Sequence, residues 1–156
     1  MKKGFQKATK IILIVLVLSY ANGASAACNV STTPVNFGSY DIFSTAPLDS
    51  TGSITVACDE QPAPTVTIAI GPSPNSGGFN PRQIKLTTGS DLLNYNLYTN
   101  NNRTRIWGDG SGSTSTMSKK VKRNKPWTPS VFGRIPPIQD VLAGLYTETL
   151  AVTITW

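Results

Sequence analysis

The chain has 156 residues, of which 14 are basic and 8 acidic, and its formal net charge at neutral pH is +6. It contains no histidine, which excludes Ser-His-Asp and Cys-His catalytic sites and any metal site that needs a histidine ligand. Four of the basic residues lie within the first ten positions, so the rest of the chain, with ten basic and eight acidic residues, is nearly neutral. The charge therefore does not indicate a surface for nucleic acid.

The first 26 residues have the composition of a secretory signal peptide. Four lysines precede the apolar run 11–18, and small residues occupy positions 24–26. We expect cleavage before Ala27 and a mature chain, residues 27–156, that forms a single domain. The apolar run is too short to span a membrane, so we expect no stable membrane anchor. A lipid anchor on Cys28 is an alternative, but Ser25 stands where such a signal needs an apolar residue.

Cys28 and Cys58 are the two cysteines of the chain. In a secreted protein an even number of cysteines indicates a disulfide, so we expect these two residues to be joined. Closing a loop of this length would stabilise the fold by about 3.5 kcal/mol in the chain-entropy treatment. The alternative is a pair of free thiols.

Beyond the signal peptide the chain has the pattern of short β-strands separated by turn residues. Apolar and polar side chains alternate with the period of a half-buried strand. The expected strands are Thr51–Cys58, Thr65–Ile70, Ile84–Thr87, Leu92–Thr99, Val131–Ile135 and Tyr146–Trp156. Eleven prolines and thirteen glycines interrupt the chain, and no long apolar stretch has helical periodicity. The pattern predicts an all-β sandwich or barrel.

Carboxylates offer one route to catalysis. Asp109 together with Asp140 or Glu148 would be the acid pair of a glycoside hydrolase. Asp109, however, lies between two glycines, a position typical of turns. We therefore expect no catalytic residue, no metal site and no cofactor.

A cluster of positive charge follows in the chain. It consists of Lys119, Lys120, Lys122, Arg123 and Lys125, and Trp127 comes two residues later. Such a cluster could contact an anionic surface, with Trp127 as an additional surface contact. The simpler interpretation, which we favour, is a solvated hairpin or loop.

The last expected strand, Tyr146–Trp156, alternates large side chains with threonine and alanine. Leu150, Val152, Ile154 and Trp156 share its apolar face, and Glu148 breaks the apolar row near its start. A strand of this kind has one face on a core. We expect it either to lie inside a sheet or to be completed by something outside the chain.

Several motifs, taken in order, resemble the spore coat protein U domain, the subunit family of archaic chaperone–usher pili in Gram-negative bacteria. They are Cys28, Val35–Tyr40 (VNFGSY), Gly52–Cys58 (GSITVAC), Leu93–Tyr98 (LNYNLY), Trp107–Gly110 (WGDG), Phe132–Pro136 (FGRIP), Gly144–Thr149 (GLYTET) and Val152–Trp156 (VTITW). The resemblance covers essentially the whole mature chain. It implies an immunoglobulin-like β-sandwich that lacks its last strand and is completed by a donor strand.

The resemblance also implies the partners. A periplasmic chaperone would fill the gap in the sandwich during secretion, and at the outer-membrane usher the N-terminal segment of another pilus subunit would replace it. The groove would be walled partly by Leu150, Val152, Ile154 and Trp156, and the disulfide would join Cys28 to Cys58. The protein would then travel through the periplasm to a pilus on the cell surface and serve adhesion and biofilm formation.

One departure from the family concerns the segment before Cys28. Subunits that polymerise carry an alternating donor segment there, whereas residues 21–27 of this chain are small or polar. We therefore expect a subunit that accepts a strand without donating one, at the fibre tip or as an accessory. The alternatives are a self-sufficient secreted module that binds a glycan or an anionic surface, and a spore or cell-surface coat protein. An enzyme is the weakest candidate.

Overall fold

The computed structural model describes residues 28–156, so the expected signal peptide and its cleavage site lie outside the described residues. The described part is all-β, as the sequence predicts. Its strands are β1 (Cys28–Thr33), β2 (Leu48–Cys58), β3 (Thr65–Ile70), β4 (Arg82–Leu86), β5 (Leu92–Tyr98), β6 (Met117–Lys120), β7 (Ser130–Ile135), β8 (Tyr146–Thr147) and β9 (Val152–Thr155). Among residues 28–156 there is no helix with the length and apolar character needed to cross a membrane.

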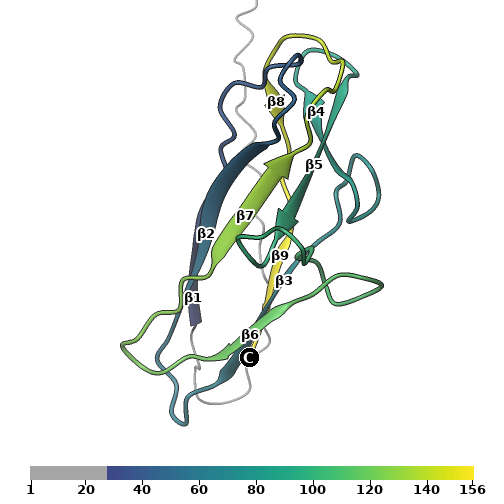
Figure 1. Ribbon diagram of the computed structural model, residues 1–156. Helices are drawn as coiled ribbons and strands as arrows, with labels where there is room; N and C mark the ends of the chain where they lie inside the picture. The colour runs from purple at the N-terminus through teal and green to yellow at the C-terminus, as the bar shows by residue number, and fades with distance from the viewer. Residues whose placement is uncertain (1–27) are drawn as a thin grey trace, which may run out of the picture.

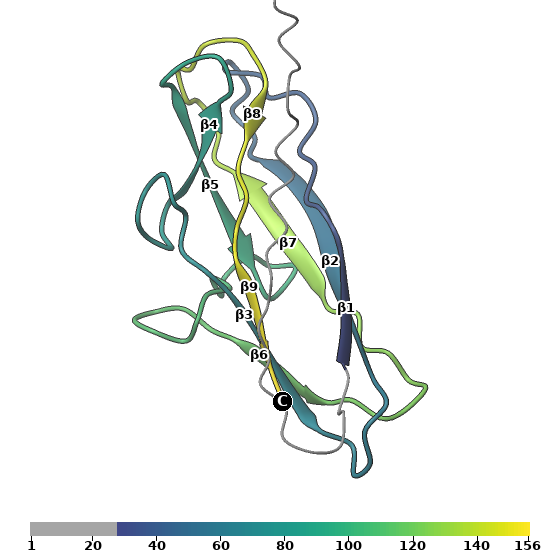
Figure 2. The same ribbon diagram turned by 180° about the vertical axis from the view of Figure 1, so that it is seen from behind.

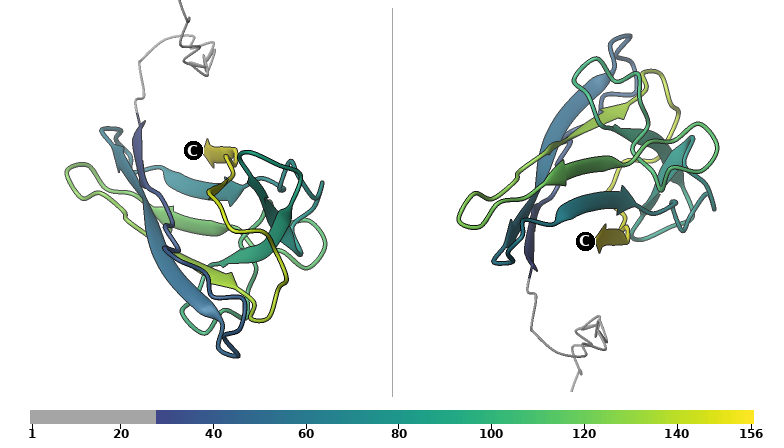
Figure 3. Two further views of the ribbon diagram at one scale, coloured as in Figure 1. Left: turned by 90° about the horizontal axis from the view of Figure 1, so that it is seen from above. Right: turned by 90° about the horizontal axis from the view of Figure 1, so that it is seen from below.

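The strands form two sheets (Figure 1). The larger has the order β1-β2-β7-β5-β4-β8 and the smaller the order β6-β3-β9, with antiparallel pairing between all neighbouring strands. The two layers are visible when the molecule is viewed along its length (Figure 3). This confirms the predicted sandwich architecture.

The core lies between the sheets and is built by alternation along the strands. The inward residues of β2 and β3 are fully buried: Ile54, Val56, Cys58, Val66, Ile68 and Ile70. Trp107 is also completely buried, and its indole nitrogen donates a hydrogen bond to the carbonyl oxygen of Ile68 at 3.1 Å. A buried indole needs such a partner for its N–H group, so this bond fixes the ring within the core.

The predicted strand Tyr146–Trp156 is divided into two in the structure. β8 pairs with β4 in the larger sheet, whereas β9 pairs with β3 in the smaller sheet. The chain crosses from one sheet to the other over residues 148–151, on the side of the molecule seen in Figure 2. The side-chain alternation continues through the crossing, which explains why the sequence pattern alone suggests one strand.

Two strands of the structure, β1 and β6, were not predicted. Both lie at the edge of a sheet, and their residues are mostly exposed. An edge strand that buries few apolar side chains lacks a clear alternating pattern, so the sequence gives little signal for it. β6 includes Lys119 and Lys120 of the basic cluster, and lysine on an edge strand discourages pairing with other chains.

Candidate functional site: an apolar groove between two strand edges

A cavity of about 1060 Å³ opens along one side of the sandwich. One wall, called the β1 wall below, runs from the end of β1 through residues 32–43, and the other, called the β9 wall, runs through residues 141–152 to the start of β9. Its floor is apolar and consists of side chains from the core strands, namely Ile54, Ile70, Ile84, Leu93, Leu97 and Val131. The cavity is therefore an elongated apolar groove, and we refer to it below as the groove.

The β9 wall presents its main chain to the open side. The amide of Gly71 donates to the carbonyl oxygen of Ala151 at 2.8 Å, and the register of β3 with β9 continues from this pair. In an antiparallel ladder, alternate residues direct their N–H and C=O groups to opposite sides. Leu150, Val152 and Ile154 therefore direct theirs away from β3, toward the open edge, where no partner strand lies within residues 28–156.

The β1 wall has the same property. Val56 and Trp127 exchange two main-chain hydrogen bonds of 2.9 Å, so the even-numbered residues of β2 pair toward β7 and the odd-numbered ones toward β1. The register of β1 with β2 then leaves the main-chain groups of Val30 and Thr32 facing the open edge. Val30 is 43% exposed although it is aligned with the buried Val56. Its exposure shows that the sandwich is open here.

The segment that follows β1 lines the groove without joining a sheet. Val35 and Phe37 are half-buried and pack against the core, whereas the intervening Asn36 is exposed. Phe37 meets the ring of Tyr95 edge-on, with ring centroids 6.1 Å apart. A side chain at Gly133 would place its Cβ atom only 2.7 Å from both Phe37 Cζ and Val35 Cγ1, so the glycine is needed for this packing.

Glu148 is the charged residue in the β9 wall. One carboxylate oxygen accepts a hydrogen bond from the Tyr95 hydroxyl, and the other accepts bonds from Ser73 Oγ at 2.5 Å and Asn75 Nδ2 at 3.2 Å. Burial, and in second place the bond to Glu148, raises the pKa of Tyr95 well above its usual range. These bonds attach the crossing segment to β5 and to the connection between β3 and β4.

Arg82 lies fully buried near this network. Its guanidinium donates to Asn96 Oδ1 at 2.9 Å and to the carbonyl oxygens of Gly71 at 3.0 Å and Trp107 at 2.7 Å, while its Nε has no partner. Burial is the main cause that lowers its pKa, and the nearby Tyr95 and Glu148 oppose the shift. The buried charge is thus held by neutral oxygens, and it joins β4 to the strands around it.

Of the four groove residues expected from the sequence, two line the groove and two do not. Leu150 and Val152 line the groove, and Val152 is 37% exposed. Ile154 packs against the core below the groove, and Trp156 lies beyond it, where its indole nitrogen donates to Glu60 at 3.0 Å. Sequence reasoning missed the wall formed by residues 32–43, although its VNFGSY motif was noted.

The expected disulfide is present: Cys28 and Cys58 are joined, 30 positions apart in sequence. Because the two residues face each other at the end of the β1–β2 ladder, the disulfide fixes the start of β1, the strand that leads into the β1 wall.

The basic cluster and Trp127 are not a joint surface. Lys119, Lys120, Lys122, Arg123 and Lys125 are exposed on β6 and the loop after it. Trp127, in contrast, is only 8% exposed and belongs to the core. Its prediction as a surface contact is corrected here, because its main-chain pairing with Val56 turns the ring inward.

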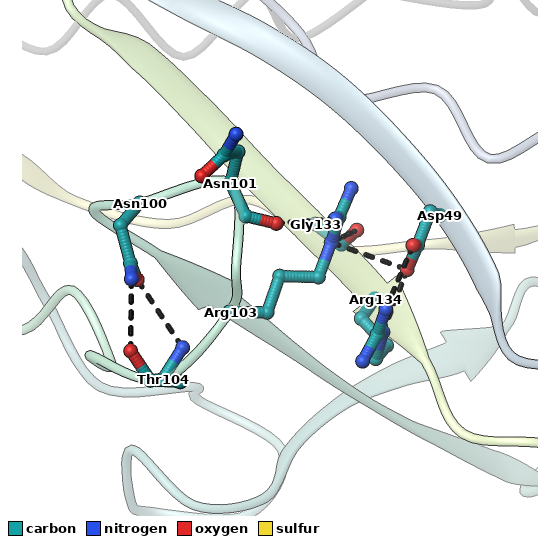
Figure 4. Close-up of polar contacts among 7 residues, drawn as sticks. All are labelled: Asp49, Asn100, Asn101, Arg103, Thr104, Gly133 and Arg134. Carbon is teal, nitrogen blue, oxygen red and sulfur yellow. Dashed lines mark hydrogen bonds and ion pairs between the residues drawn. The ribbon is translucent and has the colours of Figure 1, made fainter.

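A second polar cluster lies on the outer face of the larger sheet (Figure 4). Arg134 donates two hydrogen bonds, of 2.7 and 2.8 Å, to the carboxylate of Asp49, and Arg103 Nε lies 3.1 Å from the same carboxylate. The bond from Arg134 is the main cause that lowers the pKa of Asp49. The Arg103 guanidinium also lies over the ring of Phe132, at 5.9 Å from its centroid. The cluster joins β2 and β7 to the loop after β5.

The carboxylates considered for catalysis are engaged elsewhere. Asp109 accepts hydrogen bonds from the amide and hydroxyl of Ser111 in a turn, which lower its pKa. Glu148 is held by Tyr95, as described above. Within residues 28–156, no group of three or more acidic or cysteine side chains is arranged to hold a metal ion.

Comparison with known proteins places these features in context. The family model of the Spore Coat Protein U domain matches residues 15–153. Protein U of Myxococcus xanthus is 30% identical over 130 residues, which are 78% of this chain and 71% of the relative.

A solved structure with a similar fold is the pre-assembly complex of the chaperone CsuC with the tip adhesion subunit CsuE, from archaic chaperone–usher Csu pili of Acinetobacter baumannii. The TM-score is 0.57 at 22% identity. The match covers 84% of this chain but only 40% of the chain it matches. The likeness supports the immunoglobulin-like sandwich that the family resemblance implies.

Proposed function

Because the chain belongs to the Spore Coat Protein U domain family, we propose that it is a structural, non-catalytic subunit of a chaperone–usher type pilus whose groove accepts a β-strand from another polypeptide. The observation that carries the proposal is the apolar groove between two strand edges with outward-facing main-chain groups. Its biological roles would be surface adhesion and biofilm formation after secretion through the periplasm to the cell surface.

The chemistry of the groove favours a strand over a small ligand. A strand placed between β1 and β9 would form hydrogen bonds to the open edges on both sides while its inward side chains covered the apolar floor. The exposed valines on the two open strand edges, Val30 of β1 and Val152 of β9, would then become buried. Such edges promote aggregation when they are left open, which gives a periplasmic chaperone a physical role before assembly.

The partners follow from the same argument. A chaperone would supply the first strand, and another pilus subunit, delivered at the outer-membrane usher, would supply the final one. The complex between CsuC and CsuE is a chaperone-bound state of a subunit with a similar fold. We further propose that this subunit is a strand acceptor only, at the tip or as an accessory, since residues 21–27 offer no large apolar side chain to a groove. Self-polymerisation of the purified protein would contradict this part.

The test measures the thermal midpoint of the mature protein with and without a synthetic peptide of alternating valine and threonine. At a hundredfold excess over its Kd, a bound peptide stabilises the folded state by about 2.7 kcal/mol. For a domain of this size we expect the midpoint to rise by about 10 °C.

Two variants make the test specific to the groove. Leu150→Asp places a charge in the groove wall and should abolish the peptide effect, whereas Thr153→Asp places it on the exposed outer face of β9, outside the groove lining, and should retain it. If the peptide raised the thermal midpoints of the two variants equally, or did not raise that of the wild type, strand binding in the groove would be contradicted.

A further inference from the structure

The wall of the groove formed by residues 141–152 contains one charged residue that the apolar character of the groove does not explain. The inward side chains of residues 146–152 are Tyr146, Glu148, Leu150 and Val152, and all four line the groove. Glu148 therefore introduces a carboxylate between two large apolar neighbours. What this means for the partner rests on the proposed function, since it concerns the strand that would fill the groove.

The hydrogen bonds of Glu148 do not saturate its carboxylate. An ionised carboxylate has about four acceptor positions, and Tyr95, Ser73 and Asn75 occupy three. Within residues 28–156 the ion pairs all involve Asp49, so the Glu148 carboxylate is not in direct contact with a cation. The buried Arg82 directs its hydrogen bonds to neutral oxygens instead. One acceptor position thus remains available, and the negative charge is offset only by the field of Arg82, which makes no direct contact with it.

The position of this carboxylate along the groove is defined by its neighbours. Tyr95, its hydrogen-bond partner, lies in the floor, and Phe37, in contact with the Tyr95 ring, lies in the opposite wall. On its other side Glu148 also borders a smaller polar cavity of about 480 Å³, together with Asn75, Lys85 and Thr147. A strand in the groove would therefore pass Glu148 at the level of Tyr95 and Phe37.

Covering this level has energetic consequences for the incoming side chain. A large apolar side chain would remove water from the free acceptor position without replacing the hydrogen bond, which is unfavourable. An acidic side chain would meet a like charge at short range in a partly buried site. A side chain that donates a hydrogen bond would satisfy the carboxylate.

We infer that Glu148 determines specificity in the groove: the strand that fills it carries, at the level of Tyr95 and Phe37, a hydrogen-bond-donating residue such as asparagine, serine or threonine, and no acidic residue. The remaining inward positions of the strand face the apolar floor and require apolar side chains.

The experiment compares peptides that differ at one position. In an alternating valine–threonine host peptide, each inward valine is replaced in turn by asparagine or by aspartate, which have nearly the same shape. Fluorescence anisotropy gives the Kd of each peptide for the mature wild-type protein, for Glu148→Gln, and for Asp140→Asn as a control. Asp140 is exposed and does not line the groove, so its variant matches the loss of one negative charge.

We expect one inward position at which asparagine binds at least about tenfold more tightly than aspartate to the wild type and the control, with the ratio falling to about twofold in Glu148→Gln. The peptide with asparagine at that position should also bind the wild type at least as tightly as the valine host peptide. At every other inward position the asparagine peptide should bind more weakly than the host. This second comparison needs no variant, so it holds even if Glu148→Gln folds poorly. Peptide binding with no such position overturns the inference alone, whereas no peptide binding overturns the proposed function as well.

Discussion

Replacing Tyr95 by phenylalanine tests whether the Glu148 network stabilises the sandwich. The substitution removes only the hydroxyl that donates to Glu148 and retains the ring that packs edge-on against Phe37. Tyr95 is 5% exposed, so water cannot readily replace the lost donor. The change therefore isolates one hydrogen bond to a carboxylate.

The expected cost follows from the nature of that bond. A hydrogen bond to a charged group contributes about 1.5 to 3 kcal/mol, and leaving a buried acceptor without its donor costs a similar amount. We expect Tyr95→Phe to lower the free energy of unfolding by about 2 kcal/mol. For a domain of this size the thermal midpoint should fall by roughly 6 to 10 °C.

The pH dependence provides a second signature of Tyr95. Its pKa in the folded state is raised above the ordinary value of 10.0, mainly by burial. Above that ordinary value the unfolded chain loses the phenolic proton while the folded chain retains it. The contribution of Tyr95 to the free energy of unfolding is therefore fully present below about pH 10, and it falls by about 1.4 kcal/mol per pH unit above that value. Tyr95→Phe should remove this one-proton contribution to the alkaline slope.

Urea denaturation of the peptide-bound protein at pH 7 and above pH 10 measures both effects. Tyr98→Phe is the matched control at pH 7, because Tyr98 is half-buried and its hydroxyl makes no hydrogen bond within residues 28–156. Burial also raises the pKa of Tyr98, so the alkaline slope of the Tyr95 variant is compared with that of the wild type. If the two variants lose the same stability at pH 7, the bond between Tyr95 and Glu148 does not contribute as the structure indicates.

Three further substitutions test other parts of the fold by the same denaturation assay. Replacing both Cys28 and Cys58 by serine should lower the free energy of unfolding by about 3.5 kcal/mol, and reduced wild type more stable than the variant would show that the loss does not come from the disulfide alone. Gly52→Ala should cost about 2 kcal/mol, since its Cβ would lie 2.5 Å from the main-chain oxygen of Thr33, whereas Gly78→Ala, with no atom within 4 Å, should be close to neutral. Asp49→Asn should cost less than about 1 kcal/mol, because its ion pairs are solvent-accessible, and a larger loss would show that they are more than surface contacts.

Much of the fold could be predicted from alternation alone. The strands β2, β3, β5 and β7 bury apolar side chains at every second position, and the sequence pattern identifies each of them within a few residues. β1 escaped prediction because an edge strand with five exposed residues carries no such pattern. The groove shares this limitation, since its β1 wall depends on a strand that the sequence does not reveal.

The Glu148 network illustrates what a single sequence cannot provide. Glu148 was visible as an interruption of an apolar row, but its partners Tyr95 and Ser73 lie 53 and 75 positions away. Contacts of this kind depend on how strands are ordered in the sheets, and local periodicity carries no information on that order. The burial of Trp127, beside a run of lysines in sequence, was missed for the same reason.

The crossing of residues 148–151 between the sheets also has a mechanical consequence. Tension applied along β9 acts parallel to the strand and perpendicular to its hydrogen bonds with β3, so these bonds share the load in shear and do not open one after another. Through β8 the same tension reaches β4, which spreads the force over both layers. A domain connected in this way should resist stretching along its long axis more strongly than peeling from the side.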